Sequence, residues 1–238
     1  MRNIAVKRIA LGFACAAWVF VSAGSAQKGA PGGEWRQYGG DAGGTKYSPL
    51  DQINASNVKD LQIAWRWKTA SLAQPPEYNW EVTPLMVGDA LYFTAGPKRA
   101  AVALDASSGD TLWTYTLDEG ERGTRAPRLN NRGLAYWTDG RGAERIILVT
   151  PGFQMVELDA KSGKPFPAFG TNGVVDLWEG LGRKVAPNQI GLSSPAIVVG
   201  DVVVIGAALL AGTAPVTMNN VPGYIRGYDV RSQRQRII

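Results

Sequence analysis

Three aspartates at a regular spacing are the polar residues whose surroundings repeat along this chain. Asp105 and Asp159 lie 54 positions apart, each is followed four positions later by a glycine, and a third copy of the phrase begins at Asp229. In such a phrase the carboxylate accepts hydrogen bonds from the amides of a turn, and the glycine takes a positive φ. We therefore interpret Asp105 and its counterparts as residues that build the fold rather than as catalytic acids or bases.

Residues that usually supply nucleophiles and metal ligands are scarce. The chain has no histidine and one cysteine, Cys15, which lies inside an apolar run near the N-terminus. Neither a disulfide nor a thiolate metal site is therefore predicted. Lipid attachment at Cys15 is disfavoured as well, because the cysteine stands too early and residues 12–14 match a lipoprotein signal poorly.

The N-terminus has the order of charged, apolar and small residues that is typical of a secretory signal. Arg2, Lys7 and Arg8 precede the apolar residues 9–21, and small residues follow as far as Ala26. We predict that residues 1–26 are a signal peptide and that the protein is periplasmic, with association with the inner membrane left open. The alternative, a retained membrane anchor, is disfavoured because the run is shorter than the roughly 20 residues that a spanning helix needs.

The net charge of +5 does not indicate an acidic partner once it is located along the chain. Three of the positive charges lie in the predicted signal peptide, and four of the remaining arginines crowd the last 13 positions. No sustained basic face results, so nucleic-acid binding is not predicted.

The repeat and the strand-like stretches around it favour an all-β fold, a β-propeller of four-stranded blades. Trp113, at the end of the first phrase, is expected to cover the neighbouring blade. No helix longer than a turn or two is signalled. The strands that we expect span residues 61–69, 82–87, 90–95, 101–104, 111–116, 133–137, 146–150, 155–158, 192–199, 201–205 and 224–230, with residues 174–185 as an insertion.

The length is tight for a closed ring. About 212 residues follow the predicted signal peptide, and at 54 residues per repeat they make fewer than four blades. Because four is the lowest number normal for propellers, either the chain forms only part of a larger ring, which is the interpretation we adopt, or the interpretation of the repeat is wrong.

Six stretches in a fixed order carry a resemblance to a known family. Together they resemble the opening of pyrroloquinoline quinone (PQQ) dependent dehydrogenases, above all the branch with glucose, quinate and polyol enzymes. The similarity runs from about residue 33 to residue 232. The stretches are Gly33-Glu34-Trp35-Arg36-Gln37-Tyr38-Gly39-Gly40-Asp41, Thr45-Lys46-Tyr47-Ser48-Pro49-Leu50, Ile53-Asn54-Ala55-Ser56-Asn57-Val58, Glu81-Val82-Thr83-Pro84-Leu85, Asn131-Arg132-Gly133-Leu134-Ala135-Tyr136 and Ile225-Arg226-Gly227-Tyr228-Asp229-Val230.

The resemblance implies an eight-bladed propeller that holds PQQ at its central axis. An alcohol, polyol or sugar would be oxidised there, and the electrons would leave to a quinone or a cytochrome. Residues 27–238 would be the N-terminal part of this ring. PQQ carries carboxylates and an ortho-quinone, so its pocket needs cationic groups, hydroxyl and amide donors, and flat apolar surfaces.

Three residues match cofactor positions of the family. Glu81 matches a carboxylate that hydrogen-bonds the cofactor, Arg132 matches an arginine beside the PQQ carboxylates and quinone oxygens, and Thr150 matches a threonine whose hydroxyl contacts a carboxylate. From the residues alone, each has a structural alternative: a strand-end carboxylate, a solvated turn arginine and an ordinary strand threonine.

The sequence departs from the family pattern at two places. Residues 128–131 replace the adjacent cysteines or the histidine that many members have before the Arg-Gly pair, and the lack of any histidine puts a glucose substrate in doubt. Residues 206–213 contain no carboxylate where relatives place a Ca²⁺ ligand. Ca²⁺ is therefore expected only for a full-length parent, and no metal ligand is nominated here.

The last residues depart from the repeat. The phrase after Asp229 lacks the glycine and the outer-strand tryptophan with which members of the resembled family continue it, which indicates a truncation after about residue 232, with a native variant ending as the alternative. No match to the family's aspartate base or its lysine occurs, so no catalytic residue is nominated and the isolated chain is expected to be inactive. The rival hypothesis is a non-catalytic periplasmic propeller that serves as a scaffold for protein interaction.

Overall fold

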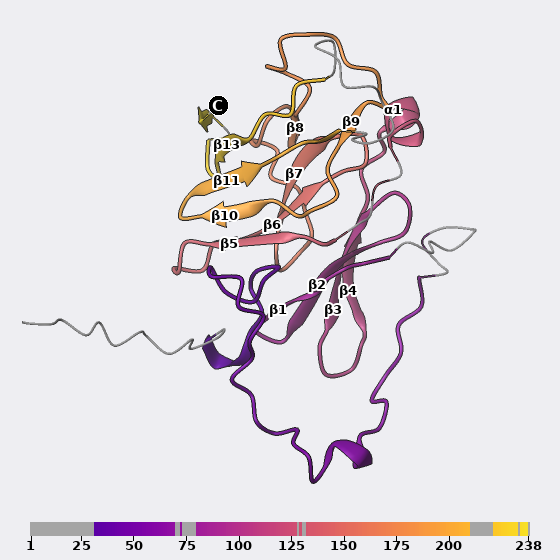
Figure 1. The fold of residues 1–238 in the computed structure, drawn as a ribbon, viewed down its shortest axis with the longest axis vertical. Coiled ribbons are helices and arrows are strands. Elements are labelled where there is room, and N and C mark those ends of the chain that lie inside the picture. The colour runs from indigo at the N-terminus through magenta and orange to yellow at the C-terminus, as the bar shows by residue number, and fades with distance from the viewer. Residues whose placement is uncertain are drawn as a thin grey trace, which may run out of the picture.

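Three four-stranded antiparallel sheets follow one another along the chain in the computed structural model (Figure 1). The structure describes residues 31–69, 72, 80–127, 129, 132–209, 221–232 and 234–237. The predicted signal peptide, residues 1–26, lies outside these residues, as do positions 128, 130 and 131 of the first departure from the family pattern. The prediction of an all-β fold built from four-stranded sheets is confirmed.

The first sheet agrees closely with the predicted strands. Its strand order is β1-β2-β3-β4, and every neighbouring pair is antiparallel. All of the residues from Ala100 to Leu104 are buried, which explains why this stretch is apolar without alternation. The strands are β1 (Leu85–Val87), β2 (Ala90–Ala95), β3 (Ala100–Asp105) and β4 (Thr111–Tyr115).

The second sheet contains a strand that the sequence pattern did not predict. Residues 174–185 were expected to be an insertion, but Val174–Asp176 forms β8 and pairs with β7 through Gln154 and Asp176. A strand of three half-buried residues shows no alternation of its own, so only its partner identifies it. The other strands, in the order β5-β6-β7-β8, are β5 (Ala135–Thr138), β6 (Glu144–Val149) and β7 (Gln154–Asp159).

The third sheet extends beyond the last strand that the sequence predicted. Residues 224–230 were expected to end the strands, but Gln235–Ile237 forms β14 beside β13, and the Asp229 amide donates to the Arg234 carbonyl at 3.0 Å. A small two-stranded sheet stands alongside. The strands are β10 (Ile197–Val199), β11 (Val202–Ile205), β13 (Arg226–Asp229) and β14, with β9 (Ile190–Gly191) and β12 (Ala208–Leu209) in the small sheet.

Helical structure is slight in the described part of the chain. It consists of two 3-10 turns, Pro31–Gly33 and Val58–Asp60, and the single-turn helix α1 (Gly120–Thr124). No described helix has the length and hydropathy needed to cross a membrane. The expectation of no helix longer than a turn or two is thus confirmed for these residues.

The repeated aspartates close the turns as expected. Asp105 Oδ1 accepts from the amides of Ser107 and Ser108 at 2.9 and 2.8 Å, and the Ser107 hydroxyl with these amides holds the pKa of Asp105 below its usual value. Asp159 and Asp229 accept in the same way from backbone amides two or three positions ahead. The carboxylates therefore have a structural task in all three sheets.

Tryptophan stacking links one blade to the next. The ring of Trp113 lies over Gly163, where an added Cβ would fall 2.5 Å from it, and its Nε1 donates to the Ala160 carbonyl at 2.9 Å. Trp65 makes the matching contact with Gly109 and donates to the Ala106 carbonyl at 3.1 Å. The prediction that Trp113 covers the neighbouring blade is confirmed, and the glycine is required because any side chain would collide with the ring.

The prediction of a strand over residues 61–69 is wrong. Residues 61–68 form no ladder with any described strand, because a strand requires a hydrogen-bonding neighbour and none of the described segments offers one there. Trp65 nevertheless lies over the first sheet as Trp113 lies over the second, and Trp67 donates to the Thr111 hydroxyl at 3.1 Å. The segment thus occupies the position of an outer strand of a blade that would precede β1.

The hydrophobic core lies between neighbouring sheets. One cluster combines Tyr92 and Trp113 of the first sheet with Ile146 and Leu148 of the second. A second cluster joins the second and third sheets through large side chains. Because the second sheet takes part in both clusters, its packing fixes how its ends meet those of the first and third sheets, whereas Ile197 and Val199 of the third sheet stay exposed. The second cluster includes Trp137, Phe153, Phe169, Leu177, Val203 and Tyr228.

Candidate functional site

The three residues that the sequence nominated lie at the same edge of their sheets. Glu81 precedes β1, Arg132 precedes β5, and Thr150 follows β6. In an antiparallel meander, the segment before the first strand and the loop between the second and third strands emerge on the same side. The topology therefore places these residues on one side of the first two blades.

Glu81 and Arg132 meet across the first two blades. Arg132 Nη2 lies 3.3 Å from Glu81 Oε2, and the side chains are 39% and 52% exposed. The backbone reinforces the approach, because the Thr83 amide donates to the Arg132 carbonyl at 3.3 Å. Gly133 has a φ of 124°, and a Cβ there would fall 3.0 Å from the Thr83 carbonyl oxygen, so the close approach depends on glycine.

The Arg132 guanidinium has hydrogen-bonding capacity to spare. Its Nε is buried and has no hydrogen-bond partner among the described residues, while its Nη2 serves Glu81. Leaving a buried donor unsatisfied costs about 1 to 3 kcal/mol, but the exposed part of the guanidinium is what a ligand could reach. A partly exposed guanidinium at this place fits a carboxylate-bearing ligand such as PQQ.

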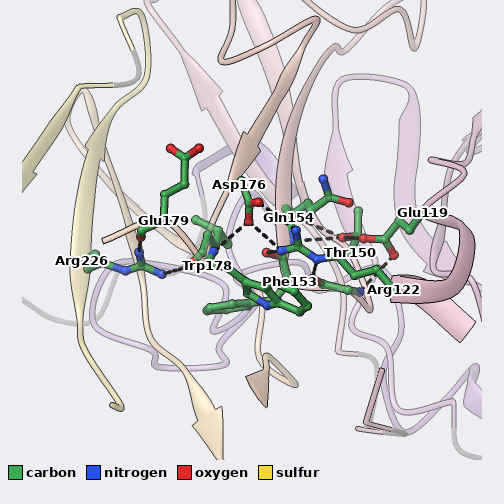
Figure 2. Close-up of polar contacts among 11 residues, drawn as sticks. Glu119, Arg122, Thr150, Phe153, Gln154, Asp176, Trp178, Glu179 and Arg226 are labelled. Atoms are coloured by element: carbon green, nitrogen blue, oxygen red, sulfur yellow. Dashed lines mark hydrogen bonds and ion pairs between the residues drawn. The ribbon is translucent and has the colours of Figure 1, made fainter. Parts of the chain in front are cut away.

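Thr150 has different surroundings. Its side chain is buried, and its hydroxyl donates to Glu119 Oε1. The Thr150 hydroxyl oxygen in turn accepts a hydrogen bond from the Gln154 amide at 3.0 Å (Figure 2). The second carboxylate oxygen of Glu119 accepts from the Gly152 amide at 3.0 Å. The carboxylate partner of Thr150 in this structure is thus Glu119, and contact with a cofactor carboxylate stays a prediction.

Arg122 completes a polar cluster around the β6–β7 turn. It donates to the carbonyls of Gly152 and Phe153 at 2.6 and 3.0 Å and forms a bidentate pair with Asp176 at 2.7 and 2.9 Å. Its guanidinium carbon lies 3.7 Å from the centre of the Trp178 ring. Although burial raises the pKa of Asp176, the bonds from Arg122 and the Trp178 amide outweigh it and leave the pKa below its usual value.

Glu119 and Arg122 were not predicted from the sequence as site residues. Both belong to the connection between β4 and β5, and their partners lie about 30 to 54 positions further along the chain. The available signal was the concentration of charge in residues 118–122, where four of five side chains are ionisable. Dense charge beside a predicted strand is common on surfaces, so it did not single these residues out.

No metal centre is formed by the residues that the structure describes. Nowhere among them do three or more histidine, cysteine, aspartate or glutamate side chains gather around one point. Residues 210–213 of the segment 206–213, where the resemblance implied a Ca²⁺ ligand position, lie outside the described part. The expectation of Ca²⁺ in a full-length parent stays a prediction.

Two open hollows lie at the opposite edge of the sheets. One, of about 370 Å³, is formed by residues around Glu34, Asp89 and Glu144, and the other, of about 490 Å³, by residues around Asp139 and Asp201. None of the three nominated residues lines either hollow. Both hollows are lined by a mixture of acidic and basic groups.

The amino-acid sequence is similar to a family of known proteins over nearly all of the described residues. The family model described as "PQQ: Glucose/ethanol/alcohol dehydrogenase, beta-propeller domain" matches residues 35–236. The glycerol dehydrogenase large subunit of Gluconobacter thailandicus is 32% identical over 209 residues, which are 84% of this chain and 27% of that protein. The quinate/shikimate dehydrogenase (quinone) of Acinetobacter baylyi is 31% identical, over 85% of this chain and 27% of that protein.

A solved structure is similar as well. The quinohemoprotein alcohol dehydrogenase from Comamonas testosteroni matches with a TM-score of 0.65 and 26% identity, over 85% of this chain and 26% of that one. The chain thus spans about a quarter of the length of the relatives that it matches.

Proposed function

The chain belongs to the family of PQQ-dependent dehydrogenases with a β-propeller domain, and from this membership we propose that it forms part of an enzyme that oxidises an alcohol, a polyol or a sugar. The names of the relatives support this range of substrates. Family membership alone would leave the site open, so the proposal rests on one observation, the convergence of Glu81 and Arg132 from two blades.

The residues of this chain would bind and orient the cofactor. PQQ, when bound, supplies an ortho-quinone that accepts the electrons of the substrate. Arg132 would donate to its anionic oxygens through the N–H groups that Glu81 leaves free, and Glu81 would hold the guanidinium in place. Thr150 would take part if its hydroxyl were released from Glu119.

We propose further that the 238-residue chain alone does not turn over. It spans about a quarter of the length of its relatives, and no catalytic residue is nominated in it. The electron acceptor proposed for the whole enzyme is a quinone or a cytochrome. We expect no dye reduction when the purified chain is mixed with PQQ, Ca²⁺ and an alcohol, and turnover under these conditions would contradict this part of the proposal.

Quenching of PQQ fluorescence tests the cofactor site directly. The chain should quench PQQ saturably, and Arg132→Ala should weaken binding about tenfold or more, because a charge-assisted hydrogen bond contributes about 1.5 to 3 kcal/mol. Arg125→Ala is the matched control, since this arginine also forms an exposed ion pair, with Glu121 at 2.9 Å. Equal affinities for the two variants would rule out the proposed site.

The rival hypothesis makes the opposite prediction in the same titration. A propeller that serves only as a scaffold for protein interaction has no need for a cation and a carboxylate to meet at the edge of two blades. Absence of saturable PQQ binding by the unmodified chain would favour the scaffold.

We also propose export to the periplasm with removal of residues 1–26, on the strength of the N-terminal sequence pattern. The mass of the protein recovered from a periplasmic fraction tests this. A chain that retains residues 1–26 would contradict the cleavage.

A further inference from the structure

A buried arginine lies among the loops of the candidate site. Arg99 stands between β2 and β3, at the same edge of the sheets as Glu81, and is only 6% exposed. Its φ is 50°, a left-handed conformation that residues with a side chain seldom adopt. Burying a guanidinium in a strained backbone position is costly unless its donors are used, so the contacts of Arg99 need an explanation.

Hydrogen bonds from Arg99 reach at least three separate segments among the described residues. Nη1 donates to the Leu192 carbonyl at 2.6 Å and to the Val149 carbonyl at 3.5 Å, and Nη2 donates to the Leu129 carbonyl at 3.3 Å. Leu129 lies three positions before Arg132, and Val149 lies directly before Thr150. One side chain of the first blade therefore holds backbone next to two of the three nominated residues.

We propose that Arg99 is a positioning residue that holds the segment carrying Arg132 in register with Glu81. The guanidinium suits this task because its donors form a rigid planar fork, which can serve several carbonyls at once. A lysine would keep the charge but would lose the fork. The link to cofactor binding rests on the function proposed above, whereas the positioning itself concerns this chain alone.

Arg226 offers a matched control within the same molecule. It is 2% exposed, and it donates to the carbonyls of Leu177 and Glu179 at 2.5 and 2.8 Å (Figure 2). Arg99 and Arg226 are thus alike in three ways: both are buried, both carry a guanidinium, and both donate to backbone carbonyls. They differ in that the segment held by Arg226 contains none of the nominated residues. Arg226→Lys therefore measures the effect on the fold of replacing any buried guanidinium with an ammonium group.

Backbone exchange measures the positioning without any cofactor. The Thr83 amide donates to the Arg132 carbonyl, so its hydrogen–deuterium exchange reports whether the Arg132 segment stays in place. The Glu179 amide, which donates to the Asp176 carbonyl at 3.3 Å, reports in the same way on the segment that Arg226 holds. In the full chain, Arg99→Lys should accelerate exchange at Thr83 and leave exchange at the Glu179 amide unchanged, whereas Arg226→Lys should do the reverse. Equal acceleration at Thr83 in both variants, or none in Arg99→Lys, would overturn the proposal.

PQQ titration supplies the second readout. Arg99→Lys should weaken PQQ binding about tenfold, by analogy with the lower end of the loss in metal affinity when residues that orient metal ligands are removed. Arg226→Lys should bind as the unmodified chain does. If Arg99→Lys does not fold, Arg99→Gln replaces it in both measurements, because Gln keeps an amide donor without a buried charge.

The two readouts separate the two proposals. If the unmodified chain does not bind PQQ, the proposed function fails, and the exchange at Thr83 still decides the role of Arg99. If the unmodified chain binds PQQ but Arg99→Lys binds equally well, the link between Arg99 and the cofactor site is wrong and the proposed function stands.

Discussion

Two pairs of arginine and glutamate at different depths show how surroundings decide what the same groups do. Glu81 and Arg132 meet at the edge of the first two sheets, and both are well exposed. Arg145 and Glu157 meet within the second sheet, where the Glu157 side chain is 0% and the Arg145 side chain 16% exposed. The exposed pair leaves donors for a ligand, whereas the buried pair is closed to one.

The buried pair also ties two blades together. Arg145 Nη1 donates both to Glu157 and to the carbonyl of Val230, in the turn that follows β13 of the third sheet, the latter at 2.6 Å. The guanidinium carbon lies 4.4 Å from the Phe166 ring centre. Burial raises the pKa of Glu157 to about 7, although Arg145 opposes the shift. The comparison teaches that desolvation turns an arginine–glutamate pair into a structural element, while solvent access keeps it available for recognition.

The largest expected effect comes from breaking the buried pair. Arg145→Ala should lower the free energy of unfolding by about 3 to 5 kcal/mol, because it leaves the Glu157 carboxylate buried without its partner. Urea unfolding at neutral pH measures this. The double variant Arg145→Met with Glu157→Leu should recover most of the loss, and a double variant as unstable as Arg145→Ala would show that the charge is not the cause.

The pH dependence of stability should come next. The raised pKa means that the folded protein holds a proton on Glu157 more tightly than the unfolded chain does. The resulting stabilisation, about 3 kcal/mol at most, is complete below the unfolded pKa of 4.5 and is lost as the pH rises through about 7. Unfolding titrations at several pH values should show this fall, and Glu157→Gln should remove it, whereas Glu81→Gln should leave it in place.

The smallest effect on stability is expected at the exposed pair. Arg132→Ala should change the free energy of unfolding by less than about 1 kcal/mol, the usual range for exposed ion pairs. Glu81→Gln should likewise be folded, yet weaken PQQ binding about threefold to tenfold, since one hydrogen bond contributes about 1 kcal/mol. A loss of stability in Arg132→Ala comparable to that in Arg145→Ala would erase the contrast between the two pairs.

Local patterns in the sequence predicted much of the fold. The aspartate and glycine of each repeat were recognised because their hydrogen bonds join residues two or three positions apart. β8 and β14 were missed because each has three residues and no alternation. Residues 61–69 alternate like a strand but lack a ladder, because the hydrogen-bonding partner of a strand is a property of the fold and not of the strand.

The candidate site was predictable only in part. Glu81 and Arg132 were nominated through the family resemblance, and the structure brings them within 3.3 Å of each other. Arg99 and Arg122 were not found, because most of their partners are backbone carbonyls, which every residue carries and which leave no mark in a sequence. Thr150 was nominated, but its pairing with Glu119 could not be read from residues 31 positions apart.

The amino-acid sequence by itself determined the all-β character, the repeat and the turns, because these depend on short-range hydrogen bonds and on side-chain patterns within a strand. The tertiary structure alone decided which charges are buried, which arginine holds which loop, and that Glu81 and Arg132 meet across two blades. The physical reason is that desolvation and hydrogen bonding between distant segments depend on how the sheets pack, and packing is a property of the assembled chain.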